Sequence, residues 1–97
     1  MIRLEAIGNL AKDAEVKEIQ SLQNKAIQFS IAVNLKKDDP PIWVSCTKWV
    51  KPGDSTNIAN YLKKGTQVFV SGLPKTFEHD GKAFQELVVF ELKLLSK

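Results

Sequence analysis

The stretch from Ile42 to Val50 alternates between two kinds of side chain, and no other feature constrains the fold as much. In an extended strand, successive side chains point to opposite faces. One face is apolar apart from Lys48 and would hold Ile42, Val44, Cys46 and Val50. The other face is polar apart from two aromatic rings and would hold Trp43, Ser45, Thr47 and Trp49. The pattern predicts a β-strand with an ordinary core face and two large rings on the opposite side.

These two tryptophans have two interpretations. Tryptophan is highly buried on average, and a sheet can be covered on both faces, which by itself favours a core role. A ring on a polar, solvent-facing surface instead indicates a flat partner. Nucleic-acid bases are such partners, and stacking one base on an aromatic side chain contributes roughly 1–3 kcal/mol. The rest of the sequence has to decide between a second core and a stacking platform.

The size and composition predict one domain, residues 1–97, with one core. No apolar run approaches the roughly 20 residues that a membrane span needs. The N-terminus, MIRLEAIGNL, lacks the basic-then-apolar layout of a secretory signal. The single cysteine, Cys46, has no partner for an internal disulfide and is predicted to be a small core residue. These features fit a reducing cytoplasm.

The charge excess is mild, but the choice of cation is informative. The net charge is +3, and Arg3 is the only arginine among 14 cationic residues. Readers of duplex DNA favour arginine for bidentate contacts with guanine edges. Lysine contacts phosphates as a point charge and reads no sequence. The composition therefore suits an acidic partner that is bound through its backbone charges.

Strands come in runs along the chain, which argues against a parallel α/β sheet. The expected strands are Ile2–Leu10 with an extension at Val16–Ile19, Ile27–Leu35, Ile42–Val50, Thr66–Phe77 and Ala83–Leu95. A short helix is expected between the third and fourth of them. An all-β, five-stranded barrel with a helix in this place is the OB-fold, which is used to bind oligonucleotides or oligosaccharides.

Two local expectations accompany this fold. The helix is predicted to start at a cap among Asp54, Ser55 and Thr56, and to end with Lys63 and Lys64 in its last turn and a left-handed Gly65. Tyr61 is assigned to its core-facing stripe, and cations at this end also stabilise a helix. In the last strand, one core face is expected to hold Phe84, Val88, Phe90, Leu92 and Leu94.

Two sequence blocks carry a family resemblance: WVSCTKW at Trp43–Trp49 and IANYLKKGTQVFVSG at Ile58–Gly72. They resemble the bacterial single-stranded DNA-binding protein family, SSB. That family has a tryptophan strand with a second aromatic six residues on, a helix ending in Tyr-Leu-Lys/Arg-Lys-Gly, and a Val-aromatic-Val/Ile-x-Gly strand. Ile7-Gly8-Asn9-Leu10 is similar to its opening strand. The resemblance covers nearly the whole chain.

The resemblance implies particular site residues and a function. Trp43 and Trp49 match the family's paired base-stacking aromatics. The family's basic positions fall on Arg3, Lys17, Lys51, Lys63, Lys64 and Lys75. The implied activity is sequence-tolerant binding and protection of single-stranded DNA in replication, recombination and repair. The implied protein is a homotetramer, or a dimer, in the bacterial cytoplasm and associated with the nucleoid, and it needs no cofactor.

The sequence departs from the family pattern in three places. Phe77 stands where the family usually has a further tryptophan among cations, and Glu78 beside it repels phosphate. The connector Lys36–Pro41 is short, and its own aspartates cancel its lysines, so we expect a solvated turn. The family usually continues into a tail whose acidic, hydrophobic tip recruits replication and repair proteins. This sequence stops at Lys97, so such partners are not predicted.

Other functional classes have less support. An RNA-binding OB module would use the same aromatics, and a primosome-type or fused OB-fold assembly subunit would use them for protein contact. His79 is a lone histidine in a turn, so a metal site is not expected. No nucleophile, base and orienting group stand together in the sequence, and an enzyme is therefore not predicted.

Overall fold

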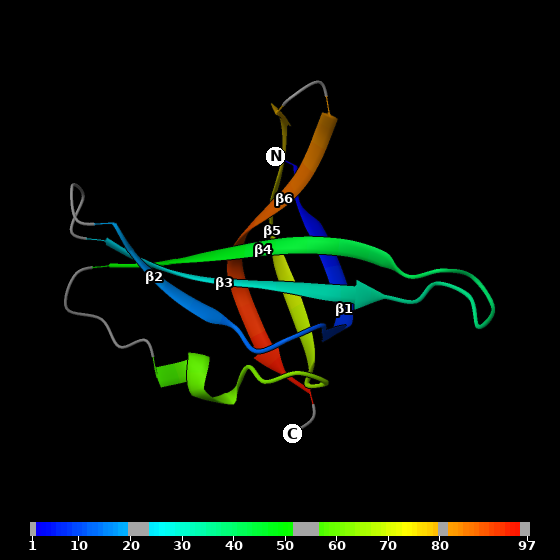
Figure 1. The fold of residues 1–97 in the computed structure, drawn as a ribbon, viewed down its shortest axis with the longest axis horizontal. Coiled ribbons are helices and arrows are strands. Elements are labelled where there is room, and N and C mark those ends of the chain that lie inside the picture. The colour runs from blue at the N-terminus through cyan, green and yellow to red at the C-terminus, as the bar shows by residue number, and fades with distance from the viewer. Residues whose placement is uncertain (1, 20–23, 52–56, 80–81, 96–97) are drawn as a thin grey trace.

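The computed structural model describes residues 2–19, 24–51, 57–79 and 82–95, and in these ranges the chain is built of strands (Figure 1). All of the strands belong to one sheet, in which most pairings are antiparallel. They are β1 (Leu4–Leu10), β2 (Glu15–Ile19), β3 (Asn24–Val33), β4 (Ile42–Val50), β5 (Gln67–His79) and β6 (Lys82–Leu94).

Five of these strands close into a barrel, as the sequence predicts. The sheet order is β1-β5-β6-β4-β3-β2, and β1 also pairs with β3, which joins the two ends of the ring. The pairing of β4 with β6 is parallel and covers only Ser45–Thr47, whereas the other pairings are antiparallel. The segment expected as an extension of the first strand is the separate strand β2, which pairs with β3 outside the ring. The architecture is that of an OB-fold.

Alternation along β3 and β4 explains where the core lies. Ile27, Phe29 and Ile31 of β3 are buried, as their spacing of two predicts. Leu35, expected to continue this face, lies beyond the end of the strand and is exposed, because β3 ends at Val33. The buried apolar cluster draws on all parts of the barrel and holds Leu10, Ile27, Phe29, Ile31, Cys46, Val50, Leu62, Val68, Val70, Leu87 and Val89.

The expected core face of the last strand is wrong at Phe90 and Leu94, which are exposed, and right at Leu92, which packs against the core, and a β-bulge at Phe90 changes the alternation. Ser71 lies opposite Glu91 while Gly72 lies opposite Val89, so the intervening Phe90 is the extra residue. Phe90 is 62% exposed, and the buried residues of β6 are Leu87 and Val89. Phe84, also expected in the core, has a side chain outside the described part of the structure.

The expected helix is a single 3-10 turn, η1 (Asn57–Tyr61). It ends before Lys63 and Lys64, so those cations do not lie in its last turn. Tyr61 is 65% exposed, so its assignment to the core is wrong, whereas Leu62 is fully buried. Gly65 has a φ of 88°, the left-handed conformation that the sequence predicts. The expected caps at 54–56 lie outside the described residues.

In the described ranges, no helix has the length and apolar character required to cross a membrane.

Candidate nucleic-acid interface

Both tryptophans stand on the outer face of β4, near its two ends. Trp43 is 59% exposed and Trp49 is 45% exposed, so the interpretation of this face as a second core is wrong. Six residues of extended strand separate them, about 20 Å at the usual rise per residue. Trp43 lies opposite Ala32, and Trp49 lies opposite Ala26 on the neighbouring β3. Each ring therefore stands beside a residue too small to cover it.

A lysine of β2 lies in line with Trp49 across the sheet. Lys17 of β2 lies opposite Ala26, which in turn lies opposite Trp49, so the three residues share one face of adjacent strands. The ammonium of Lys17 is 3.4 Å from Glu15 Oε2, but both side chains remain more than half exposed. Lys51 follows the strand directly and is exposed. The Trp49 end of β4 thus carries two of the predicted cations.

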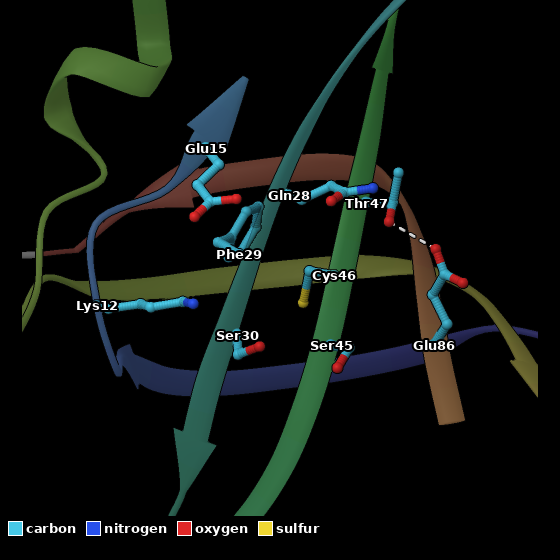
Figure 2. A pocket seen from close by; sticks show the side chains of 9 residues that line it. All are labelled: Lys12, Glu15, Gln28, Phe29, Ser30, Ser45, Cys46, Thr47 and Glu86. Atoms are coloured by element: carbon cyan, nitrogen blue, oxygen red, sulfur yellow. Dashed lines mark hydrogen bonds between the residues drawn. The ribbon is translucent and has the colours of Figure 1, made fainter. Parts of the chain in front are cut away.

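A polar hollow lies on the same surface (Figure 2), and the residue pairs Ser30–Ser45 and Gln28–Thr47 that line it fall between the two tryptophans in the β3–β4 register. The hollow has a volume of about 270 Å³. Its lining comes from the β1–β2 connection and from β2, β3, β4 and β6: Lys12, Glu15, Gln28, Phe29, Ser30, Ser45, Cys46, Thr47 and Glu86. Thr47 Oγ1 donates a hydrogen bond to Glu86 Oε1 at 2.5 Å, which explains how this polar side chain of the outer face is buried.

A second row crosses the hollow and reaches another predicted cation. Ser45 lies opposite Glu86, and Glu86 lies opposite Lys75 of β5. Lys75 is exposed. Phe77, two residues further along β5, pairs with Phe84 through the backbone, and its side chain lies outside the described part of the structure. The barrel therefore brings Lys75 to the β6 side of the surface between the tryptophans.

Arg3 belongs to a different side of the barrel. Its Nε donates a hydrogen bond to Ser71 Oγ at 2.6 Å, and its Nη2 is 3.9 Å from Glu91 Oε2. Ser71 of β5 lies opposite Glu5 of β1, and Glu91 of β6 lies opposite Ser71 on its other side. Arg3 therefore lies beside Ser71 and Glu91, away from β4, and its side chain remains half exposed.

Lys63 and Lys64 lie where the 3-10 turn meets the start of β5. Asp13 holds this region: its Oδ1 accepts a hydrogen bond from the Lys64 backbone N–H at 2.8 Å, and its Oδ2 is 3.8 Å from Lys63 Nζ. Ala14 N–H also donates to the Leu62 carbonyl at 2.9 Å. These contacts fasten the β1–β2 connection to the end of the turn, and they place a negative charge beside one of the two predicted cations.

The apolar side of β4 is confirmed at Val44, Cys46 and Val50, whereas Ile42 at the start of the strand is half exposed. Burial, and then the nearby charge of Glu86, raise the pKa of the Cys46 thiol from 9.0 to about 12. The thiol is therefore protonated at neutral pH and serves as a core side chain. Lys48, which interrupts this side, lies opposite Ile27 and is partly buried.

Five polar residues that line the hollow were not predicted as site residues from the sequence: Lys12, Glu15, Gln28, Ser30 and Glu86. The polar side of β3 was visible as Gln28 and Ser30 alternating with buried residues, so their position on a surface could have been read from the strand pattern. Glu86 could not be placed in this way, because its neighbours depend on a parallel pairing and on a bulge further along β6. Among the residues that the structure describes, no group of potential ligands could hold a metal ion.

Comparison with known proteins gives a consistent family result. A family model described as the single-strand binding protein family matches residues 1–91. A protein of Clostridium acetobutylicum named "Single-stranded DNA-binding protein 2" is 34% identical over 98 residues, covering 92% of this chain and 72% of the relative. These matches confirm the resemblance seen in the sequence.

Two further relatives are longer than the region they share with this chain. "Single-stranded DNA-binding protein" of Clostridium perfringens is 32% identical over 83 residues, covering 84% of this chain and 54% of the relative. "Single-stranded DNA-binding protein 3" of Listeria innocua is 30% identical over 97 residues, covering 95% of this chain and 59% of the relative. The chain thus spans little more than half the length of these two relatives.

Proposed function

The chain belongs to the single-strand binding protein family, and on this premise we propose that it binds single-stranded DNA with broad sequence tolerance. One observation carries the proposal: the only two tryptophans of the chain are both exposed on one face of β4, at opposite ends of a polar hollow. Exposed rings that flank a polar surface suit unpaired bases, because every base has a face that can stack.

The proposed mechanism divides the work between rings and lysines. Trp43 and Trp49 stack on unpaired bases, and Lys17, Lys51 and Lys75 attract the phosphates that run along the rim of the face. Lysine suits this task because its ammonium acts as a point charge and imposes no base identity. Duplex DNA is rejected because its bases are already stacked on one another. No chemical step is part of the mechanism.

The remaining predicted residues have smaller parts in the proposal. Lys63 and Lys64 can extend the cationic track, although Asp13 offsets the charge of Lys63. Arg3 is engaged by Ser71 and Glu91 and would act mainly on the opposite side of the barrel. Phe77 remains a candidate for a further stacking ring. We propose that one barrel contacts a stretch of about 4–16 nucleotides, as other OB-folds do.

The cellular role we propose is protection of transient single strands during DNA replication, recombination and repair in the bacterial cytoplasm. We also propose that the protein is a homotetramer or dimer that wraps longer strands. A second hollow of about 430 Å³, lined by Ile2, Arg3, Leu73 and Phe90, exposes apolar side chains that a subunit contact would cover. A solution mass of one chain at micromolar concentration would contradict the wrapping part of this proposal.

The test is a titration of the intrinsic fluorescence with oligothymidine at two ionic strengths. Because both tryptophans lie on the proposed face, stacked bases should quench most of the emission. Raising the salt concentration should weaken binding, since each neutralised phosphate of a single strand contributes a slope of about −0.7 in log K against log salt. Emission that stays constant as oligothymidine is added would overturn the proposed interface.

Competition separates the proposal from its alternatives. An RNA-binding module would prefer RNA over DNA oligonucleotides of the same sequence, whereas the proposed function requires DNA to compete at least as well. An assembly subunit that uses its aromatics for protein contact would show no quenching by either nucleic acid. Duplex DNA of the same length serves as the negative control.

A further inference from the structure

The hollow between the tryptophans has the size of a site for one small ring. Its volume of about 270 Å³ lies just below the 300–1,000 Å³ of pockets that hold drug-sized ligands. It is lined from β3 and β4 by Gln28, Ser30, Ser45 and Thr47. The two serines lie opposite each other in the ladder, and Gln28 lies opposite Thr47. A base lying between the two stacking rings would meet hydrogen-bonding groups here.

The β6 side of this hollow carries a carboxylate that the protein orients. Figure 2 shows the Thr47 hydroxyl directed at Glu86, to which it donates a hydrogen bond at 2.5 Å. That bond engages Oε1 of the carboxylate. Among the described residues, Thr47 is the hydrogen-bond partner found for the Glu86 side chain, which leaves Oε2 for a ligand. Across the hollow, Glu15 Oε2 lies 3.4 Å from the Lys17 ammonium.

An ionised carboxylate can only accept hydrogen bonds, and it repels phosphate. The edge of cytosine presents an amino group that donates to such an acceptor, and glutamate–cytosine contacts of this type are known in DNA recognition. Thymine presents a carbonyl oxygen and a methyl group at the corresponding position. Glu86 would therefore attract the first base and repel the carbonyl of the second, while phosphates would be kept at the rim beside the lysines.

We propose that Glu86 makes the hollow between Trp43 and Trp49 selective for a base with an exocyclic amino group, so that cytosine is preferred to thymine at this one position. The inference rests on the proposed function, because it assumes that bases reach this face. It adds a graded preference at a single position to an interface that is otherwise sequence-tolerant. Thr47 acts as a positioning residue that holds the carboxylate.

The experiment compares all-cytosine with all-thymine oligonucleotides of about 16 nucleotides, at mildly alkaline pH so that cytosine remains uncharged. Affinities are measured by fluorescence anisotropy for the parent, for Glu86→Gln and for Glu5→Gln. Glutamine keeps the size of Glu86 and can still accept from Thr47, but it lacks the charge and can donate to thymine. Glu5 is an exposed carboxylate on β1 and serves as the matched charge control.

The expected result is that the ratio of cytosine to thymine affinity falls about fivefold in Glu86→Gln, the low end of what one base contact discriminates, and is unchanged in Glu5→Gln. An equal change in both variants, or no change in Glu86→Gln, would overturn the inference. A failure of the proposed function looks different, since the parent would then bind neither oligonucleotide.

A second measurement needs no substitution in the protein. An oligonucleotide in which hydrogen replaces the amino group of each cytosine should bind the parent about fivefold more weakly than the cytosine oligonucleotide does. Equal affinity for the two would overturn the inference even if Glu86→Gln failed to fold.

Discussion

Trp49 lies directly opposite Ala26 in the β3–β4 ladder, and Ala26 is fully buried although it shares the outer face with the ring. The larger side chains of Trp49 and Lys17 flank this alanine on the two neighbouring strands. At the other end of β4, Trp43 also stands opposite an alanine, Ala32, which is partly buried. Small residues on β3 therefore leave both indoles exposed on the barrel surface, where they are free to stack.

The first prediction concerns these two rings. Trp43→Ala or Trp49→Ala should each weaken the binding of oligothymidine by roughly 1–3 kcal/mol, because each removes one stacking platform. The thermal unfolding midpoint should change little, since both side chains are largely exposed. Anisotropy of a labelled oligonucleotide measures the affinity without relying on the fluorescence that the substitutions remove.

A matched control for this prediction is available on the 3-10 turn. Tyr61 is also a largely exposed aromatic residue, but it belongs to the 3-10 turn and not to the strands that carry the tryptophans and the hollow. Tyr61→Ala should leave the affinity within experimental error of the parent. If Tyr61→Ala weakened binding as much as the tryptophan variants did, the site would have to be moved toward the turn.

The second prediction concerns the lysines and uses the salt dependence of binding. Lys51→Ala and Lys75→Ala should each flatten the plot of log K against log salt by about 0.7, the contribution of one phosphate on a single strand. Both lysines are exposed and border the tryptophan face. Lys93→Ala provides the control, because Lys93 Nζ is 3.3 Å from Glu91 Oε1 on the other side of the barrel.

Lys63 tests how far the cationic track extends. Its ammonium lies 3.8 Å from Asp13 Oδ2, so Lys63→Ala should change the salt slope by less than Lys51→Ala does. An equal change would mean that DNA displaces Asp13 and that the track reaches the start of β5.

The facing of side chains could be predicted from the sequence for β4 but not for β6. The opposite facing of the tryptophans and Cys46 followed from alternation, because β4 pairs with β3 along its whole length. Alternation left open whether the tryptophans form a second core, and the family resemblance favoured their exposure. The position of Phe90 could not be predicted in the same way, since one extra residue at a bulge reverses the facing of everything beyond it. The hollow was missed for a related reason: Glu86 reaches β4 only through a short parallel pairing between distant segments.

The basic residues show a different limit. A resemblance assigns cations to positions along the chain, but it does not predict what each ammonium or guanidinium contacts. Lys51, Lys75 and Arg3 are all exposed, but Arg3 also contacts Ser71 and Glu91. Whether a cation is available to a ligand depends on carboxylates that are remote in sequence, and these become neighbours only when the barrel closes.

The third prediction contrasts two glycines. A Cβ at Gly72 would overlap the carbonyl oxygen of Val88, so Gly72→Ala should destabilise the fold by more than the usual 0.5–3 kcal/mol. A Cβ at Gly65 meets nothing within 4 Å, and only its φ of 88° opposes substitution. Gly65→Ala should therefore cost about 1 kcal/mol, and Gly65→Asn should cost less. Urea unfolding of the three variants measures how much stability each one loses. Similar losses of stability for Gly65→Ala and Gly72→Ala would contradict the close contact at the bulge.

The last prediction concerns pH and the buried thiol. Burial, and then the charge of Glu86, raise the pKa of Cys46 from 9.0 to about 12, so between these values the folded chain keeps a proton that the unfolded chain loses. The contribution of this group to stability is therefore fully present below about pH 9 and is lost as the pH rises toward about 12. The free energy of unfolding should fall less steeply over this range in Cys46→Ala than in the parent.

A thiolate-selective reagent should label native Cys46 slowly at neutral pH and rapidly in urea, since the thiolate is the reactive form. Rapid labelling of the native protein, or identical pH dependence in the two chains, would show that the thiol is more accessible to solvent than its 2% exposure indicates.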